Sequence, residues 1–75
     1  MITKKQLNLI GYHPSQNDKT MFVAHGSWEY GFCISKQELW FLNDGFGEPQ
    51  FECKITDFQL LKDFLELKNE IYENI

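Results

Sequence analysis

The stretch from Thr20 to Thr56 constrains the fold most, because β-branched and aromatic residues dominate it and turn-forming residues interrupt it at short intervals. Short apolar runs bounded by Gly, Asn, Asp or Ser are typical of β-strands joined by tight turns. We expect about four strands, near residues 20–25, 28–34, 38–43 and 50–55. The connections between them are too short for a crossover to a parallel neighbour, so they predict an antiparallel meander.

Alternation along these strands assigns side chains to the two faces of the sheet. In the second strand, Trp28, Tyr30, Phe32 and Ile34 share one face, and Glu29, Gly31, Cys33 and Ser35 share the other. In the fourth, Phe51, Cys53 and Ile55 alternate with Gln50, Glu52 and Lys54. The first set in each strand is apolar, so we expect one face of the sheet to be buried.

The run Leu39–Leu42 places large apolar side chains on both faces of the third strand. Trp40 and Leu42 are expected on the second face, which must be covered or left exposed. Two interpretations stay open. The first helix could cover this face, through Leu7, Leu9 and Ile10. Alternatively, a partner protein or a second copy could do so, since exposed aromatic groups are typical of binding surfaces.

Two helices are predicted to flank the sheet. Thr3 and Gln6 match the capping box that begins a helix, and Gly11 supplies a stop. We expect a helix over about residues 4–10, then coil in the run YHPSQNDK, which holds Pro14.

The last segment repeats the capping signature, with Thr56 as the cap and Gln59 completing the box. Apolar residues then form a broad arc on the helix: Phe58, Leu60, Leu61, Phe64, Leu65, Leu67, Ile71 and Tyr72. Roughly 17 helical residues would span about 25 Å, enough to cross the sheet. The predicted fold is therefore α+β, one domain over residues 1–75 with both helices around an antiparallel meander.

The opposite side of that last helix is acidic, with a row formed by Asp63, Glu66, Glu70 and Glu73. An exposed helix face is usually charged, so the row can be a plain solvated surface. Like charges one turn apart repel one another, however, and only Lys62 lies nearby. The row could therefore dock on a basic groove of a protein that handles nucleic acid. Lys68 lies toward the apolar side and is expected to snorkel or pair.

The segment FLNDGFGEPQF, Phe41 to Phe51, is interpreted as a hairpin loop, because its Asn, Asp and Gly residues tolerate positive φ. Its acids lack the spacing of a calcium loop, and its glycines lack the order of a phosphate loop. Turn chemistry does not explain Phe46. It either packs on the sheet edge or is an exposed anchor for a partner.

Two cysteines and two histidines, His13, His25, Cys33 and Cys53, are too irregularly spaced to predict a zinc site. Cys33 and His25 match a nucleophile and base only in residue type. We expect no catalytic residue, metal or cofactor, with reduced thiols, Cys53 in the core and both histidines on the surface.

The charge balance disfavours direct binding of nucleic acid. The net charge is -4 and the chain has no arginine, the residue best suited to bidentate phosphate contacts. Mean hydropathy is -0.41, no apolar run is long enough to span a membrane, and no secretory signal is present, so we expect a cytoplasmic protein.

The short acidic chain, its aromatic meander WEYGFCISKQELWFL and its last helix DFLELKNEIYENI are similar to small proteins of phages and mobile elements, among them the anti-CRISPR inhibitors. That resemblance lies in architecture and implies a mechanism class: stoichiometric binding to an RNA-guided nuclease that blocks its guide or target channel, with carboxylates in place of phosphates. The partner-binding candidates are Asp63, Glu66, Glu70, Glu73, Trp40 and Phe46. The alternative is a structural or regulatory interaction protein, antitoxin-like or a dimeric accessory subunit, that uses the second sheet face. A small enzyme that uses Cys33 or His25 is the third hypothesis.

Overall fold

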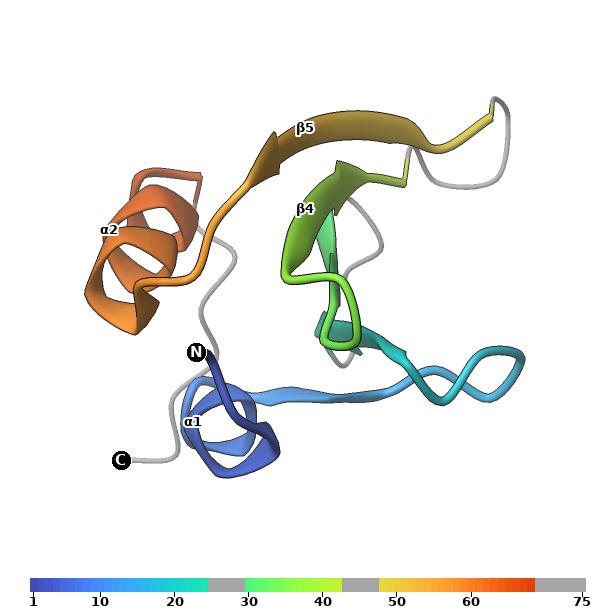
Figure 1. Cartoon of the computed structure of the whole chain (residues 1–75), viewed down its shortest axis with the longest axis horizontal. Helices are drawn as coiled ribbons and strands as arrows, with labels where there is room; N and C mark the ends of the chain where they lie inside the picture. Colours follow the sequence, from blue (N-terminus) through green and yellow to red (C-terminus); the bar gives the residue numbers. More distant parts are fainter. Residues whose placement is uncertain (25–29, 43–47, 69–75) are drawn as a thin grey trace.

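A computed structural model describes residues 1–24, 30–42 and 48–68 of the chain (Figure 1). Its elements are α1 (Lys4–Leu9), β1 (Tyr12–Pro14), β2 (Met21–Ala24), β3 (Tyr30–Cys33), β4 (Glu38–Phe41), β5 (Gln50–Lys54) and α2 (Phe58–Leu67). The strands form one sheet in the order β1-β2-β3-β4-β5, and every neighbouring pair is antiparallel. The predicted α+β meander is therefore confirmed, with five strands rather than about four.

The first helix begins and ends where its sequence signals predict. The backbone N–H of Gln6 donates to Thr3 Oγ1 at 3.2 Å, and the backbone N–H of Thr3 donates to Gln6 Oε1 at 2.9 Å. These two bonds satisfy donors that have no partner inside the helix. Gly11 follows the last turn with φ of 85°, a conformation that glycine adopts without a Cβ clash.

The extra strand, β1, lies in the run expected to be coil. Tyr12 is opposite Ala24 of β2, and Pro14 is opposite Phe22. The backbone N–H of Ser15 also donates to Met21 O at 2.8 Å. Three residues are too short to show a period, and Pro14 is tolerated here because β1 is an edge strand. Residues 12–14 therefore form a strand because they pair with β2, and not because of a pattern in their own sequence.

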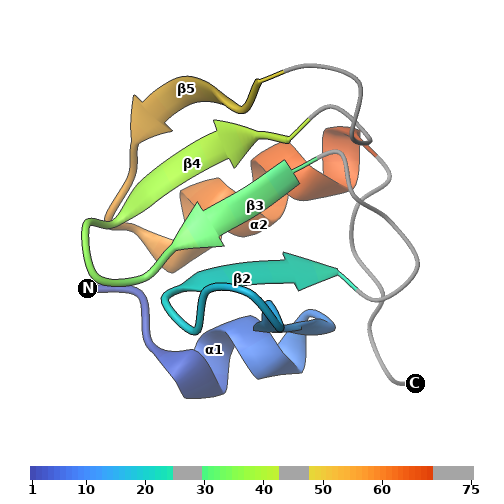
Figure 2. The same ribbon diagram turned by 90° about the vertical axis from the view of Figure 1, so that its right-hand side faces the viewer.

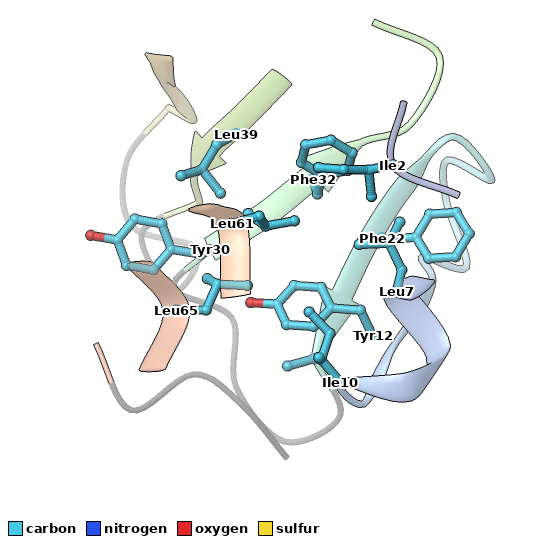
Figure 3. Close-up of a cluster of buried hydrophobic side chains, with 11 residues drawn as sticks. Ile2, Leu7, Ile10, Tyr12, Phe22, Tyr30, Phe32, Leu39, Leu61 and Leu65 are labelled. Carbon is cyan, nitrogen blue, oxygen red and sulfur yellow. The ribbon is translucent and has the colours of Figure 1, made fainter. Parts of the chain in front are cut away.

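Strand register divides the side chains between two faces. On one face, Phe22, Phe32 and Leu39 lie opposite one another across β2, β3 and β4. The buried cluster on this face also contains Ile2, Leu7, Ile10, Leu61 and Leu65, from the N-terminal segment and both helices (Figure 3). Tyr30 packs edge-on against Phe41 at 5.4 Å and against Phe64 at 5.3 Å between ring centroids. We call this side the core face.

Both helices therefore cover the same face of the sheet, which Figures 1 and 2 show from two directions. One helix is about 10 Å across, whereas five strands are roughly 20 Å wide, so one helix cannot close the core alone. The interpretation that Leu7, Leu9 and Ile10 cover the second face is wrong. Leu7 and Ile10 lie in the core cluster, and Leu9 is exposed.

A buried glutamine joins the N-terminus to the turn between β3 and β4. Gln37 Oε1 accepts from the backbone N–H of Ile2 at 2.7 Å, and Gln37 Nε2 donates to Ile2 O at 3.0 Å and Ile34 O at 2.9 Å. Its φ is 55°, unusual for a residue other than glycine. Three bonds, two to Ile2 and one to Ile34, explain why this polar side chain is buried.

The second helix begins one residue later than predicted. Asp57, not Thr56, is its cap, and its side chain accepts from the backbone N–H groups of Gln59 at 2.9 Å and Leu60 at 3.5 Å. Asp is at least as good a cap as Thr and its charge favours the positive end of the helix. The helix ends at Leu67 with Lys68 as its C-cap, so it has 10 residues and the predicted length of roughly 17 residues is wrong. Among the described helices, neither has the length and apolar character needed to cross a membrane.

Candidate protein-interaction surfaces

The face of the sheet opposite the core carries an aromatic pair. Gly31 of β3 lies opposite Trp40 of β4, and Trp40 lies opposite Phe51 of β5. The Trp40 and Phe51 rings meet edge-on, with centroids 5.8 Å apart and an interplanar angle of 74°. Phe51 is 52% exposed and Trp40 is partly buried, while Trp40 Nε1 donates to Glu38 Oε1 at 3.3 Å. We call this side the aromatic face.

The missing side chain of Gly31 shapes the centre of the aromatic face. A Cβ at Gly31 would lie 2.7 Å from Leu42 Cδ1 and 2.8 Å from Met21 Sδ. The side chains of Leu42 and Met21 therefore occupy the space above β3 that a side chain at position 31 would otherwise fill. Met21 and Leu42 are partly buried, and Val23, opposite Gly31, is buried. The predicted position of Trp40 and Leu42 on the second face agrees with this arrangement.

A β-bulge brings Phe51 to the aromatic face. Leu39 pairs with Cys53, but the next residue on β4, Trp40, pairs with Phe51, so β5 has one extra residue at this point. A bulge interrupts the alternation of side chains along a strand. The prediction that Phe51 and Cys53 share a face is therefore wrong. Strict alternation gave no sign of the bulge, and the aromatic partner of Trp40 was missed for this reason.

The outer side of α2 carries the acidic residues that the sequence singled out. Asp63 and Glu66 are exposed, and Gln59 Nε2 donates to Asp63 Oδ1 at 2.9 Å. Leu60 and Leu67 are 59% and 82% exposed. The predicted apolar arc is thus wider than the part of α2 that packs against the sheet. The residues of α2 that pack in or against the core are Phe58, Leu61, Phe64 and Leu65.

Lys68 follows the last turn of α2, and its ammonium group lies 5.7 Å from the centroid of the Phe64 ring. Its side chain is exposed. The expectation that Lys68 snorkels or pairs is confirmed, with an aromatic ring as its partner.

The sequence candidates do not form one surface. Trp40 lies on the aromatic face, whereas Asp63 and Glu66 lie on α2, which packs against the core face. The sheet separates the two groups, so a single flat partner cannot contact both. Phe46, Glu70 and Glu73 lie outside the described residues.

The two cysteines occupy contrasting places. Cys33 is buried at the end of β3, and its Sγ lies 3.4 Å from Ser35 Oγ and 4.0 Å from Thr20 Oγ1. Burial raises the pKa of this thiol, but hydrogen bonds from Ser35, the Lys36 backbone and Thr20 together outweigh it and lower the pKa. Hydroxyl and backbone groups around the sulfur therefore set the direction of this pKa shift.

Cys53 is exposed, which corrects its predicted place in the core. It lies on β5, an edge strand whose five residues are all exposed. His13 is partly buried on β1, so its predicted surface position is only partly correct, and His25 lies outside the described residues. Over residues 1–24, 30–42 and 48–68, no three His, Cys, Asp or Glu side chains gather as metal ligands would.

Comparison with protein families, curated proteins and solved structures found no match to this chain.

Proposed function

We propose that this chain acts by binding another protein through its aromatic face, without chemistry of its own. The observation that carries the proposal is the edge-on pair of Trp40, which is partly buried, and Phe51, which is 52% exposed, on a face that neither described helix covers. Interface energy concentrates in a few large aromatic residues, and tryptophan is the most enriched of them. A pre-packed ring pair loses little side-chain freedom on binding, which favours affinity.

Polar groups at the margin suit the same role. Glu38 accepts the Trp40 indole N–H, and Lys54 lies directly opposite Glu38 on β5. Protein interfaces commonly combine an apolar centre with a charged rim, in which the rim adds specificity more than affinity. The centre here consists of Met21, Leu42, Trp40 and Phe51.

The test is capture of a partner from lysate of the host cell by the tagged chain, with and without nuclease treatment, identified by mass spectrometry. Phe51→Ser and Trp40→Ser should lose the captured protein. Leu60→Ser is the matched control, because Leu60 has similar exposure but lies on α2, on the other side of the sheet. Equal loss in all three variants, or no loss in the first two, would contradict the proposal, provided that circular dichroism shows all three folded.

A second candidate function is inhibition of an RNA-guided nuclease, as in the anti-CRISPR proteins. Asp63 and Glu66, exposed on the outer side of α2 beside Leu60 and Leu67, favour it. Carboxylates spaced along a helix can occupy phosphate positions in a basic channel and so exclude the guide or target strand. In this function the chain is cytoplasmic and binds the effector ribonucleoprotein, not free nucleic acid.

Cleavage assays with a panel of RNA-guided nucleases test this second candidate. The double variant Asp63→Lys with Glu66→Lys should lose inhibition by one hundredfold or more, and raised salt should weaken the unmodified chain. Trp40→Ser should inhibit normally. If the double variant retains inhibition while Trp40→Ser loses it, the acidic helix is not the binding element.

A further inference from the structure

Glu38 adds a carboxylate to the Trp40–Phe51 pair of the aromatic face. Glu38 and Trp40 are two residues apart on β4, so their side chains project from the same face of the sheet. Trp40 Nε1 donates to Glu38 Oε1 at 3.3 Å, which holds the carboxylate beside the indole ring. Phe51 meets the same ring edge-on, with the centroids 5.8 Å apart. Two aromatic rings and one carboxylate therefore lie within reach of a single ligand group.

The arrangement of the two rings favours a positively charged ligand. Their planes are 74° apart, so they cannot both stack on one flat group and instead form two walls of a corner. An aromatic ring has a negative face, which attracts cations, and aromatic rings on more than one side are typical of sites that bind alkylated ammonium groups. Phe51 is 52% exposed and Trp40 is only partly buried, so a partner can reach both rings.

The carboxylate strengthens this preference in two ways. Donation of the indole N–H to a negative group polarises the ring and makes its face more negative. The carboxylate also has lone pairs beyond the one that accepts from Trp40, since its two oxygens offer about four acceptor sites. A cation stacked on Trp40 near Nε1 can therefore donate to Glu38 at the same time.

The charges on β4 and β5 also favour a cation, although one of them is a lysine. The two strands carry two carboxylates, Glu38 and Glu52, against the ammonium of Lys54, and the whole chain has a net charge of -4. Lys54 is directly opposite Glu38, and its exposed side chain competes for this carboxylate. An ammonium group lacks the planar surface that stacks on a ring, however, so a planar cation suits the site better.

We propose that the aromatic face binds an arginine side chain of the partner protein, which stacks its guanidinium on Trp40 beside Phe51 and donates to Glu38. A guanidinium is planar, is always charged and pairs with carboxylates through parallel N–H groups, so it fits both parts of the site. This chain contains no arginine, so the group comes from a different protein and not from a second copy. The inference rests on the proposed function, because it names the group that the aromatic face recognises.

Titration with N-acetyl-arginine amide, followed by NMR at the Trp40 indole N–H, is the first experiment. The citrulline analogue is the matched control, because it has nearly the same shape but no charge. At constant ionic strength the Trp40 signal should shift about threefold further per millimolar of arginine than of citrulline, the factor expected of a cation–π contact at an accessible site. Equal shifts with the two compounds would overturn the proposal.

Variants of the chain test the carboxylate in the same titration. Glu38→Gln keeps an oxygen that accepts from Trp40 Nε1 but removes the charge, so it should bring the arginine shift close to that of citrulline. Glu66→Gln makes the same change on the exposed side of α2 and should have no effect. Lys54→Ala removes the competing ammonium and should increase the arginine shift. An unchanged shift in Glu38→Gln, or a smaller one in Lys54→Ala, would contradict the proposed site.

Partner capture separates this proposal from the proposed function. Trp40→Leu keeps apolar area but removes the ring, and both Trp40→Leu and Glu38→Gln should lose most of the captured protein while circular dichroism shows them folded. Capture that Trp40→Ser loses but Trp40→Leu and Glu38→Gln keep would refute the arginine site and leave the proposed function standing. Capture that all three variants keep would refute the proposed function, even where the titration shows that the rings bind arginine.

Sedimentation of the unmodified chain tests the remaining source of a cation, a lysine of a second copy. The chain should be monomeric, because an ammonium group cannot both stack on Trp40 as a planar group does and pair with Glu38. A dimer that Glu38→Gln dissociates would assign the site to a second copy and overturn the proposal.

Discussion

The two faces of the sheet consist of the same strands but are covered in different ways. The core face is covered by α1 and α2, and side chains such as Phe22 and Phe32 are fully buried there. The aromatic face has neither described helix above it and relies on side chains that lean over Gly31 and on one ring pair. Burial by a second layer stabilises a fold, whereas partial burial within one layer leaves area for a partner. The difference suggests that stability and binding can be changed separately in this protein.

The largest expected effect is on the core face. Phe32→Ala should lower the free energy of unfolding by about 3–5 kcal/mol, because a fully buried ring leaves a cavity that the helices cannot fill. In so small a domain this removes most of the stability. Urea denaturation measures the loss. Phe51→Ala on the aromatic face is the matched comparison and should cost about 1 kcal/mol, since half of that ring is already in water. Similar losses would show that the two faces are energetically equivalent.

Gln37 joins the core layer to the sheet, and its loss should have the next largest effect. Gln37→Ala leaves the buried N–H and C=O of Ile2 without their partners, which costs about 1–3 kcal/mol. Protection of the Ile2 amide against hydrogen exchange should fall together with stability in urea. Lys36→Ala, at the exposed neighbouring position, should change neither quantity. Unchanged exchange at Ile2 in Gln37→Ala would argue that this bond does not hold the N-terminus.

A substitution at Gly31 tests how side chains pack over the centre of the aromatic face. Gly31→Ala should destabilise by about 1 kcal/mol, because the new methyl group displaces Leu42 and Met21, whose flexible side chains can move. In a Leu42→Ala background the same change should cost less, so the two effects should not add. Thermal unfolding of the four chains in this cycle measures the coupling. Additive losses would mean that Leu42 does not limit the space above Gly31.

The smallest expected change in stability concerns Cys33, which lies beside the aromatic face. Hydrogen bonds lower the pKa of this thiol despite its burial, with Ser35 as the leading donor. Ser35→Ala should therefore raise the pKa and shift the pH profile of alkylation toward higher pH, in a Cys53→Ser background that leaves one thiol. Because the folded pKa lies below the unfolded value, ionisation adds stability only as pH rises above the folded pKa, so the change in stability at neutral pH should be slight. A profile that stays in place would rule out Ser35 as the group that stabilises the thiolate.

Much of the candidate site was visible in the sequence, but its partner residue was not. Alternation placed Trp40 and Leu42 on the second face, and helical spacing placed Asp63 and Glu66 on the outer side of α2. Phe51 was assigned to the wrong face because a bulge breaks the two-residue period, and no residue type signals a bulge of this kind. The burial of Cys53 was overestimated for a related reason. Periodicity gives the face of a residue, not whether its strand lies at an edge.

Local signals alone predicted both helices and four of the five strands of this protein. The capping box of Thr3 and Gln6, the stop at Gly11 and the short spacing of apolar runs act between residues that are neighbours in the chain, so they are readable before folding. Tertiary structure decided which face both helices cover, the strand at Tyr12–Pro14, and the link of Gln37 to Ile2. Each of these depends on contacts between residues distant in sequence, and their free energy exists only once the chain has closed around a common core.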